Sequence, residues 1–293
     1  MLQGYPVFDA DAHGSINPRM WEDLPEPYRA RRPRPVTIHD DSGLGNYNAG
    51  WLIDGSLEPH AFGPGAQQAN TPRNVLAEFG ADSRRDHCSI GSMTLTDPQA
   101  RLRDMDRMGI DAQMVFPSTL YAHMTSDPGF EAALYRAYNR FVAGQCKTAP
   151  RRLKWSGLLP LRDQRQSFEA IEEMQRLGAR AAVVFGTASE RLLSDPIFIP
   201  VWDEFARAKL PLCVHMGMSY PPLARLGQSI YDGHIIGMSL PAQLAFMAIV
   251  SSDFPHGEGR ENAALEILER KDLSAAQKQK LLYDNTVRLF GQP

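Results

Sequence analysis

The feature that most constrains the fold of this chain is an alternation of two kinds of segment between residues 97 and 217. Short apolar stretches without polar alternation follow stretches in which apolar residues recur every three or four positions. Continuous apolar strands joined by helices are typical of a parallel sheet covered on both faces. The expected strands of this alternation are AQMVFPS (112–118), LKWSGLLPL (153–161), ARAAVVFG (179–186) and LPLCVHMG (210–217), and YPVFDADAH (5–13) is expected to form an earlier one. Repeated strand–helix units predict an α/β fold of the TIM-type (β/α) barrel class.

Capping signals set the expected helix boundaries within this alternation. Asp97 followed by Pro98 predicts a helix start, because aspartate caps free backbone N–H groups and proline suits the first helical position. Gly109 marks the end of this helix. Its apolar stripe is formed by Leu102, Met105 and Met108. Further helices are expected around 130–142, 168–177 and 196–205.

The C-terminal tail is expected to form one more packed helix. Ser274 and Gln277 have the spacing of a capping box, in which each side chain bonds the other residue's backbone N–H. The apolar face of this helix is expected to carry Leu281, Leu282 and Leu289.

A long stretch from about residue 33 to 96 interrupts the regular pattern. It is rich in Gly, Pro, Asn and Asp, although WLIDG (51–55) has the composition of one arm of a hairpin. Loops of this length in compact domains are typically functional lids or disordered segments, and a linker between domains is the blander interpretation. Nothing before this stretch is large enough to fold alone, so we expect a single domain over 1–293 with an irregular inserted lid at about 33–96.

Composition narrows the classes of partner. The 293 residues carry a net charge of −3, and the basic run RARRPRP (29–35) is local, which disfavours a nucleic-acid surface. Cys88, Cys146 and Cys213 lack metal-type spacing and indicate no disulfide framework. The start MLQGYPVFDAD has no leader pattern, and the longest apolar stretch, AQLAFMAIV, is shorter than a membrane span. We expect a cytoplasmic protein acting on a small-molecule substrate, with no nucleic-acid or membrane partner.

Polar residues stand at the ends of three expected strands. Asp11 and His13 are two apart on one strand, so both side chains point to the same face. His215 ends the strand LPLCVH, and Asp253 ends the apolar run MAIVSSD. Because the C-terminal strand ends of a parallel barrel meet at one rim, we predict that these four residues bind one divalent metal ion. Two imidazoles and two carboxylates suit zinc or manganese.

Each of these residues also has a structural interpretation that needs no metal ion. A single His or Asp at a strand end is more often a cap or a satisfied hydrogen-bonding group than a ligand. Asp9 is expected to be a buried structural carboxylate. Asp253, His234 and His256 are the candidates for proton transfer. The two histidines suit this role because an imidazole near neutrality serves as acid or base. His256 equally suits the cap of a following helix.

The order of several motifs resembles the amidohydrolase-related family, in the branch with aminocarboxymuconate-semialdehyde decarboxylase and the hydroxybenzoate decarboxylases. The motifs are FDADAH, DPQARLRDMDRMGIDAQMVFPS, YNRFVAGQC with PRRLKWSGLLPL, SDPIFIPVWDEFARAKLPLCVHMG, SSDFPHGEG and LLYDNTVRLFG. By position, Asp11 and His13 match the paired first-strand ligands, while His215 and Asp253 match the ligand of the fifth strand and the aspartate of the eighth. Aspartate at position 11 is more similar to the decarboxylase-like subgroup than to hydrolases with two histidines there.

The resemblance implies a metal-dependent enzyme for small carboxylated or cyclic substrates. Nonoxidative decarboxylation is the first expectation, and hydrolysis of a lactone or amide is the alternative, since both reactions share one set of ligands. A truncated, catalytically inactive relative is the third possibility.

The interval 216–252 is too short for the family's complete barrel. It holds 37 residues, whereas each strand–helix unit needs roughly 30 residues. We therefore expect an incomplete barrel of about six strands, lacking strands six and seven. Open sheet edges pair readily with other chains, so a homo-oligomer is expected, with the edges covered by a neighbour or by the segment 33–96.

Overall fold

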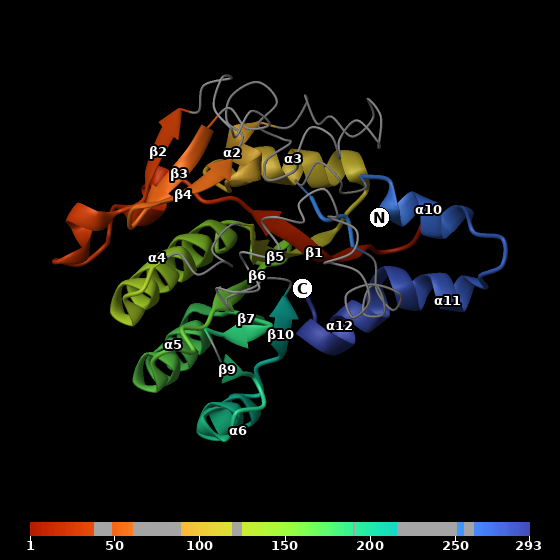
Figure 1. The fold of residues 1–293 in the computed structure, drawn as a ribbon. Helices are drawn as coiled ribbons and strands as arrows, with labels where there is room; N and C mark the ends of the chain where they lie inside the picture. The colour runs from red at the N-terminus through yellow and green to blue at the C-terminus, as the bar shows by residue number, and fades with distance from the viewer. Residues whose placement is uncertain (38–48, 61–88, 119–124, 190, 216–250, 255–260) are drawn as a thin grey trace, which may run out of the picture.

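A five-stranded parallel sheet forms the centre of the computed structural model, which describes residues 1–37, 49–60, 89–118, 125–189, 191–215, 251–254 and 261–293 (Figure 1). In spatial order the strands are β1 (Phe8–Gly14), β5 (Ala112–Pro117), β6 (Leu153–Leu158), β7 (Ala181–Phe185) and β10 (Leu212–His215). Each strand pairs in parallel with the next one along the chain that belongs to this sheet. The curled sheet is one part of a TIM-type barrel, which confirms the predicted α/β class and its incomplete form among the described residues.

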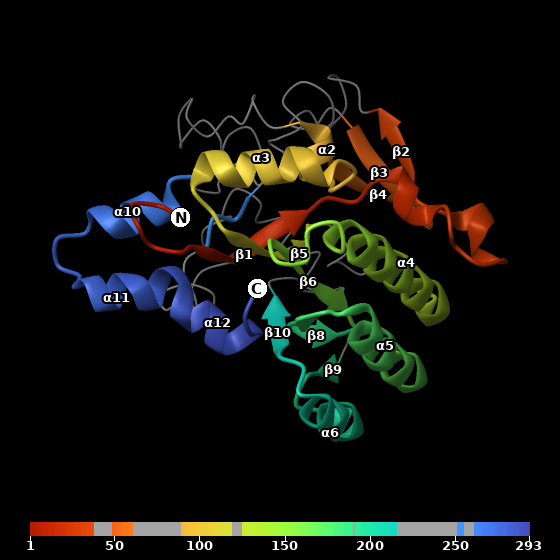
Figure 2. The same cartoon turned by 180° about the vertical axis from the view of Figure 1, so that it is seen from behind.

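Helices connect the strands and cover the outer side of the sheet. Figures 1 and 2 show α4, α5 and α6 side by side along the sheet, with α3 above β1. The connecting helices are α3 (Pro98–Met108), α4 (Pro128–Cys146), α5 (Gln164–Leu177), η5 (Pro196–Phe198) and α6 (Ile199–Ala208). A short hairpin of β8 (Thr187–Ala188) and β9 (Arg191–Leu192) follows β7. No helix in these ranges is long and apolar enough to cross a membrane.

The predicted capping chemistry sets the ends of α3. The Asp97 side chain accepts a hydrogen bond from Ala100 N, and Gly109 ends the helix at a left-handed φ of 72°. The buried side of α3 differs from the predicted stripe, because Arg101 is buried with Met105 and Met108. Leu102 is only partly buried. A charged residue therefore occupies a core-facing position of this helix.

The segment expected to be an irregular lid contains regular structure. An antiparallel sheet follows β1 and is formed by β2 (Arg34–Thr37), β3 (Ala49–Ile53) and β4 (Ser56–His60). The predicted hairpin arm 51–55 covers part of β3, where Trp51 and Ile53 are buried on one face. Short helices flank this sheet: η1 (Pro18–Trp21), η2 (Tyr28–Arg31) and α2 (Ile90–Met93). Period-two burial over so few residues is too short to stand out in the sequence.

The C-terminal helices lie on the other side of β1 from α4 and α5 (Figures 1 and 2). They are α10 (Ala263–Glu269), α11 (Ala275–Gln279), the π-helical turn η7 (Lys280–Asp284) and α12 (Asn285–Phe290). The predicted capping box at Ser274 and Gln277 is present.

The buried face of this last helix differs from the predicted face by one position. Leu282 is buried as predicted, but Leu289 is 48% exposed, and Phe290 is buried in its place. The π-helical turn holds one more residue per turn than an α-helix, so it rotates the following residues around the helix axis. Phe290 thereby packs near Phe8 of β1, with ring centroids 6.5 Å apart.

The segment 251–254 lies beside β1 but does not form the regular strand that was expected. Asp253 N donates to Asp11 O at 2.9 Å, and His13 N donates to Phe254 O. Asp253 has a φ of 54°, in the left-handed region, which breaks the extended repeat of a strand. The segment therefore holds the free edge of β1 by irregular pairing. The predicted absence of strands six and seven concerns residues 216–250, which lie outside the described ranges.

Candidate metal centre

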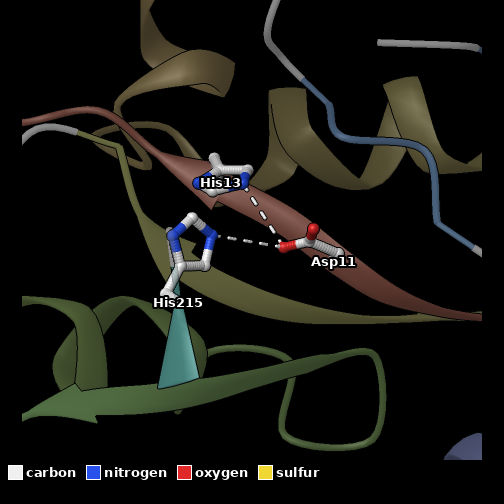
Figure 3. Close-up of side chains that lie close together, drawn as sticks. All are labelled: Asp11, His13 and His215. Carbon is white, nitrogen blue, oxygen red and sulfur yellow. Dashed lines mark ion pairs between the residues drawn. The ribbon is translucent and has the colours of Figure 1, made fainter. Parts of the chain in front are cut away.

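Strands β1 and β10 bring together three of the four predicted ligands. Asp11 and His13 lie on one face of β1, and His215 is the last residue of β10. Figure 3 shows both imidazoles directed toward the Asp11 carboxylate. One ligand atom from each residue lies within 4.8 Å of the others. Strands at opposite ends of the five-stranded order thus meet at one point, as the curl of a barrel requires.

The distances within this cluster match a coordination site. His13 Nε2 lies 3.3 Å from Asp11 Oδ1, and His215 Nε2 lies 3.9 Å from the same oxygen. Two ligand atoms bound at about 2.1 Å to one ion lie roughly 3.0–3.4 Å apart at octahedral or tetrahedral angles. Small movements of His215 would bring all three atoms to such distances, so the donor set fits one divalent ion.

Hydrogen bonding fixes which nitrogen of His13 faces the cluster. His13 Nδ1 lies 3.1 Å from the carbonyl oxygen of Pro117, at the end of β5. A carbonyl accepts only, so Nδ1 carries a proton in this contact and Nε2 is the nitrogen that faces the cluster. This is the arrangement that metal-binding imidazoles require.

The carboxylates of Asp11 and Asp253 favour a positive charge beside them, as the pKa of His13 shows. Burial alone would lower the pKa of His13, but hydrogen bonds and negative charge from Asp11 and Asp253 outweigh it and raise this pKa to about 10. The carboxylates surround a side chain that is 2% exposed. A divalent cation would meet the same demand, and the imidazole would then bind it in the neutral form.

Asp253, the fourth predicted ligand, lies beside His13. Its Oδ1 lies 3.1 Å from His13 Nε2, and its side chain is 31% exposed, against 11% for Asp11. Asp253 is therefore the more exposed of the two carboxylates next to His13.

The expectation that Asp9 is a buried structural carboxylate agrees with its surroundings. Asp9 is 1% exposed and accepts hydrogen bonds from Gln113 Nε2 and from both the backbone and the hydroxyl of Ser252. Burial raises the pKa of Asp9 to about 6, against the opposing effect of these bonds from Ser252.

Sequence reasoning missed Arg101 and Gln113, which lie behind the cluster. Both side chains are 0% exposed. Arg101 occupies the place on the α3 stripe four residues before Met105, and Gln113 stands within an apolar strand. The signal in the sequence that could have identified them is a polar residue at a position that faces the core.

The proton-transfer candidates His234 and His256 lie outside the described residues. Asp253 is therefore the predicted proton-transfer group whose surroundings the structure gives.

Comparison with known proteins adds evidence on the fold. Protein-family models and curated protein sequences give no match. Among solved structures, an amidohydrolase from Mycobacterium avium subsp. paratuberculosis superposes with a TM-score of 0.67 at 16% identity, over 98% of this chain and 100% of that one. The chain has the fold of this amidohydrolase.

Two further solved structures match over nearly their full lengths. A 5-carboxyvanillate decarboxylase from Novosphingobium aromaticivorans, solved with bound manganese, has a TM-score of 0.62 and 13% identity, over 99% of this chain and 98% of that one. The IDCase of Metarhizium anisopliae has a TM-score of 0.58 and 13% identity, over 97% of both chains. These likenesses establish the barrel architecture and agree with the family resemblance found in the motifs.

Proposed function

We propose that this amidohydrolase-fold protein is a metal-dependent enzyme that removes carbon dioxide from a small carboxylated aromatic or cyclic substrate without oxidation. The observation that carries the proposal is the convergence of Asp11, His13 and His215, with Asp253 beside them, at one point of a parallel barrel sheet. The manganese-bound structural neighbour is a decarboxylase, which supports this reaction class.

Asp11, His13 and His215 are the residues that would hold the ion, zinc or manganese, with Asp253 as the fourth ligand or as an acid beside it. When bound, the ion would neutralise the substrate carboxylate and an adjacent oxygen, stabilising the charge that develops during the reaction. The hydrogen bond from His13 Nδ1 to Pro117 keeps the imidazole in the orientation for binding.

We assign Asp253 the role of proton donor to the substrate. As the carbon–carboxylate bond breaks, its electron pair stays on the substrate carbon, and that carbon must take up a proton. The Asp253 carboxyl group would supply it, since it is the more exposed of the two cluster carboxylates. His234 and His256 remain the alternative donors.

Hydrolysis of a lactone or amide is the second candidate, favoured by the amidohydrolase neighbour. The same residues would hold the ion, and Asp253 would take a proton from the attacking water instead of giving one. A catalytically inactive relative, which keeps the ligand set but turns nothing over, is the third.

Carbon dioxide release and ring opening separate these candidates. Purified protein would be assayed with zinc and with manganese on a panel of hydroxylated aromatic acids, lactones and amides. We expect carbon dioxide from an aromatic acid, at least about a hundredfold less from Asp253→Asn, and no loss from the surface control Asp272→Asn, whose side chain is 60% exposed. Ring opening alone would favour the hydrolase. Bound metal without turnover would favour the inactive relative.

We also propose a homo-oligomer, on the observation that β10 ends the five-stranded order of the described sheet. Its Val214 is 60% exposed and its Leu212 is 38% exposed. Exposed apolar edge strands pair with other chains. Small-angle scattering should give a mass above that of one chain, and a monodisperse monomer would refute the assembly.

A further inference from the structure

Four polar residues form a continuous hydrogen-bonded chain behind the candidate metal centre. They are Arg101 on α3, Gln113 on β5, Asp9 on β1 and Ser252 in the segment 251–254, and we call them the buried polar chain. Their exposed fractions are 0%, 0%, 1% and 2%. Polar groups so completely buried are costly unless each is paired, so their pairing dictates how the four elements fit together.

The hydrogen bonds of the buried polar chain converge on Asp9 from both ends. Arg101 Nε donates to Gln113 Oε1 at 2.8 Å, and Gln113 Nε2 donates to Asp9 Oδ2 at 3.0 Å. Asp9 then accepts from Ser252 N at 2.9 Å and from Ser252 Oγ. The Gln113 amide therefore bridges the Arg101 guanidinium and the Asp9 carboxylate. The same carboxylate accepts two hydrogen bonds from Ser252.

Both ends of the buried polar chain reach residues next to the candidate ligands. Ser252 directly precedes Asp253, and its hydroxyl also accepts from Phe254 N at 3.1 Å. At the other end, Arg101 Nη2 donates to the carbonyl oxygen of His13 at 3.0 Å. The Arg101 guanidinium also lies 4.3 Å from the centroid of the Phe254 ring. The segment 251–254 is therefore held from both sides of Asp253.

A residue in the left-handed region needs such support. Asp253 has a φ of 54°, a conformation that is sparsely populated outside glycine and persists where the surroundings determine it. We infer that Asp9, Gln113, Arg101 and Ser252 are positioning residues, which hold Asp253 against His13. The inference rests on the proposed function for the role of Asp253, but its structural content does not depend on a bound metal.

Amide hydrogen exchange tests this inference directly, because two amides report on the pairing of segment 251–254 with β1. They are the amides of Asp253 and His13. In purified Ser252→Ala, loss of the hydroxyl's bond to the Asp9 carboxylate and of its bond from Phe254 N should speed exchange at both by about tenfold or more. The matched control is Ser156→Ala, because Ser156 is 0% exposed and its hydroxyl donates to Val115 O at 3.1 Å. Ser252→Thr, which keeps the hydroxyl, should restore slow exchange.

Equal exchange at these two amides in Ser252→Ala and Ser156→Ala would overturn the inference. If Ser252→Ala does not fold, Gln113→Glu serves instead. It keeps an acceptor for Arg101 but sets a second carboxylate against Asp9, and it should speed exchange at the same two amides.

Cobalt titration of the same variants separates this inference from the proposed function. The visible spectrum of bound Co²⁺ depends on ligand geometry, so Ser252→Ala should bind cobalt with an altered spectrum, while Ser156→Ala keeps the parent spectrum. A parent protein that binds no cobalt counts against the proposed function and leaves the exchange result to decide the positioning role. A parent that binds cobalt, with an unchanged spectrum and exchange in Ser252→Ala, contradicts the positioning role alone.

Discussion

Gly157 on β6 offers a test of how tightly the sheet packs against α5. A Cβ atom at this position would lie 2.6 Å from Met174 Cγ and closer still to Met174 Sδ, whereas non-bonded carbon atoms prefer about 3.5–4.0 Å. Met174 is 0% exposed, so the side chain must move within a filled core. Overpacking costs about 1–3 kcal/mol, and the lost backbone freedom of the unfolded glycine offsets about 0.5–1 kcal/mol. We expect Gly157→Ala to lower the free energy of unfolding, by up to about 2.5 kcal/mol.

The same substitution on the helix surface should have the opposite sign. Gly144 lies on α4, and a Cβ there meets no atom within 4 Å. Gly144→Ala should therefore raise the free energy of unfolding by up to about 1 kcal/mol. Urea denaturation followed by circular dichroism measures both variants. In a Met174→Ala background Gly157→Ala should become neutral or stabilising, because the two positions are in contact. Equal effects at Gly157 and Gly144 would refute the packing between β6 and α5.

Three further predictions address other parts of the molecule. Leu282→Ala should cost about 2–5 kcal/mol and Leu289→Ala less than about 0.5 kcal/mol in urea denaturation, and similar costs would contradict the rotation by the π-helical turn. Hydrogen bonds from Arg31 lower the pKa of Asp54, so the stability they add is present above the unfolded pKa of about 3.9 and is lost as pH falls through the lower folded pKa. The stability gap between the parent and Asp54→Asn should accordingly shrink below about pH 4, and a gap that stays constant would argue against the pairing. Burial raises the pKa of Cys146 to about 12, so iodoacetamide at pH 8 should label it far more slowly in folded than in urea-unfolded protein when followed by mass spectrometry, and equal rates would exclude its burial.

Much of the barrel was predictable because local chemistry and tertiary packing agree there. Asp97 and Gly109 set the two ends of α3 through hydrogen bonds within a few residues. The apolar strands need burial on both faces wherever they lie in the fold. The three cluster residues were predictable for a related reason. His13 and His215 stand near the C-terminal ends of parallel strands, which meet at one rim, and Asp11 shares the face of His13 because it lies two residues earlier on the same strand.

Other features depend on contacts that no local pattern encodes. The π-helical turn that exchanges Leu289 for Phe290 depends on the fit of α12 against β1. The left-handed conformation of Asp253 depends on bonds that the backbone of Ser252 and Asp253 donates to Asp9 and to β1, more than two hundred positions away. The burial of Arg101 depends on Gln113, His13 and Phe254 together. Such long-range polar networks are visible only once the elements are placed.

The central claim is that Asp11, His13 and His215 bind one divalent ion. A crystal of the protein grown with manganese, with data collected on both sides of the manganese absorption edge, tests it most directly. We predict one anomalous peak about 2.0–2.3 Å from an Asp11 oxygen and from Nε2 of both imidazoles, and its loss in His215→Ala. A peak elsewhere, or none at these residues in saturating manganese, would contradict the claim.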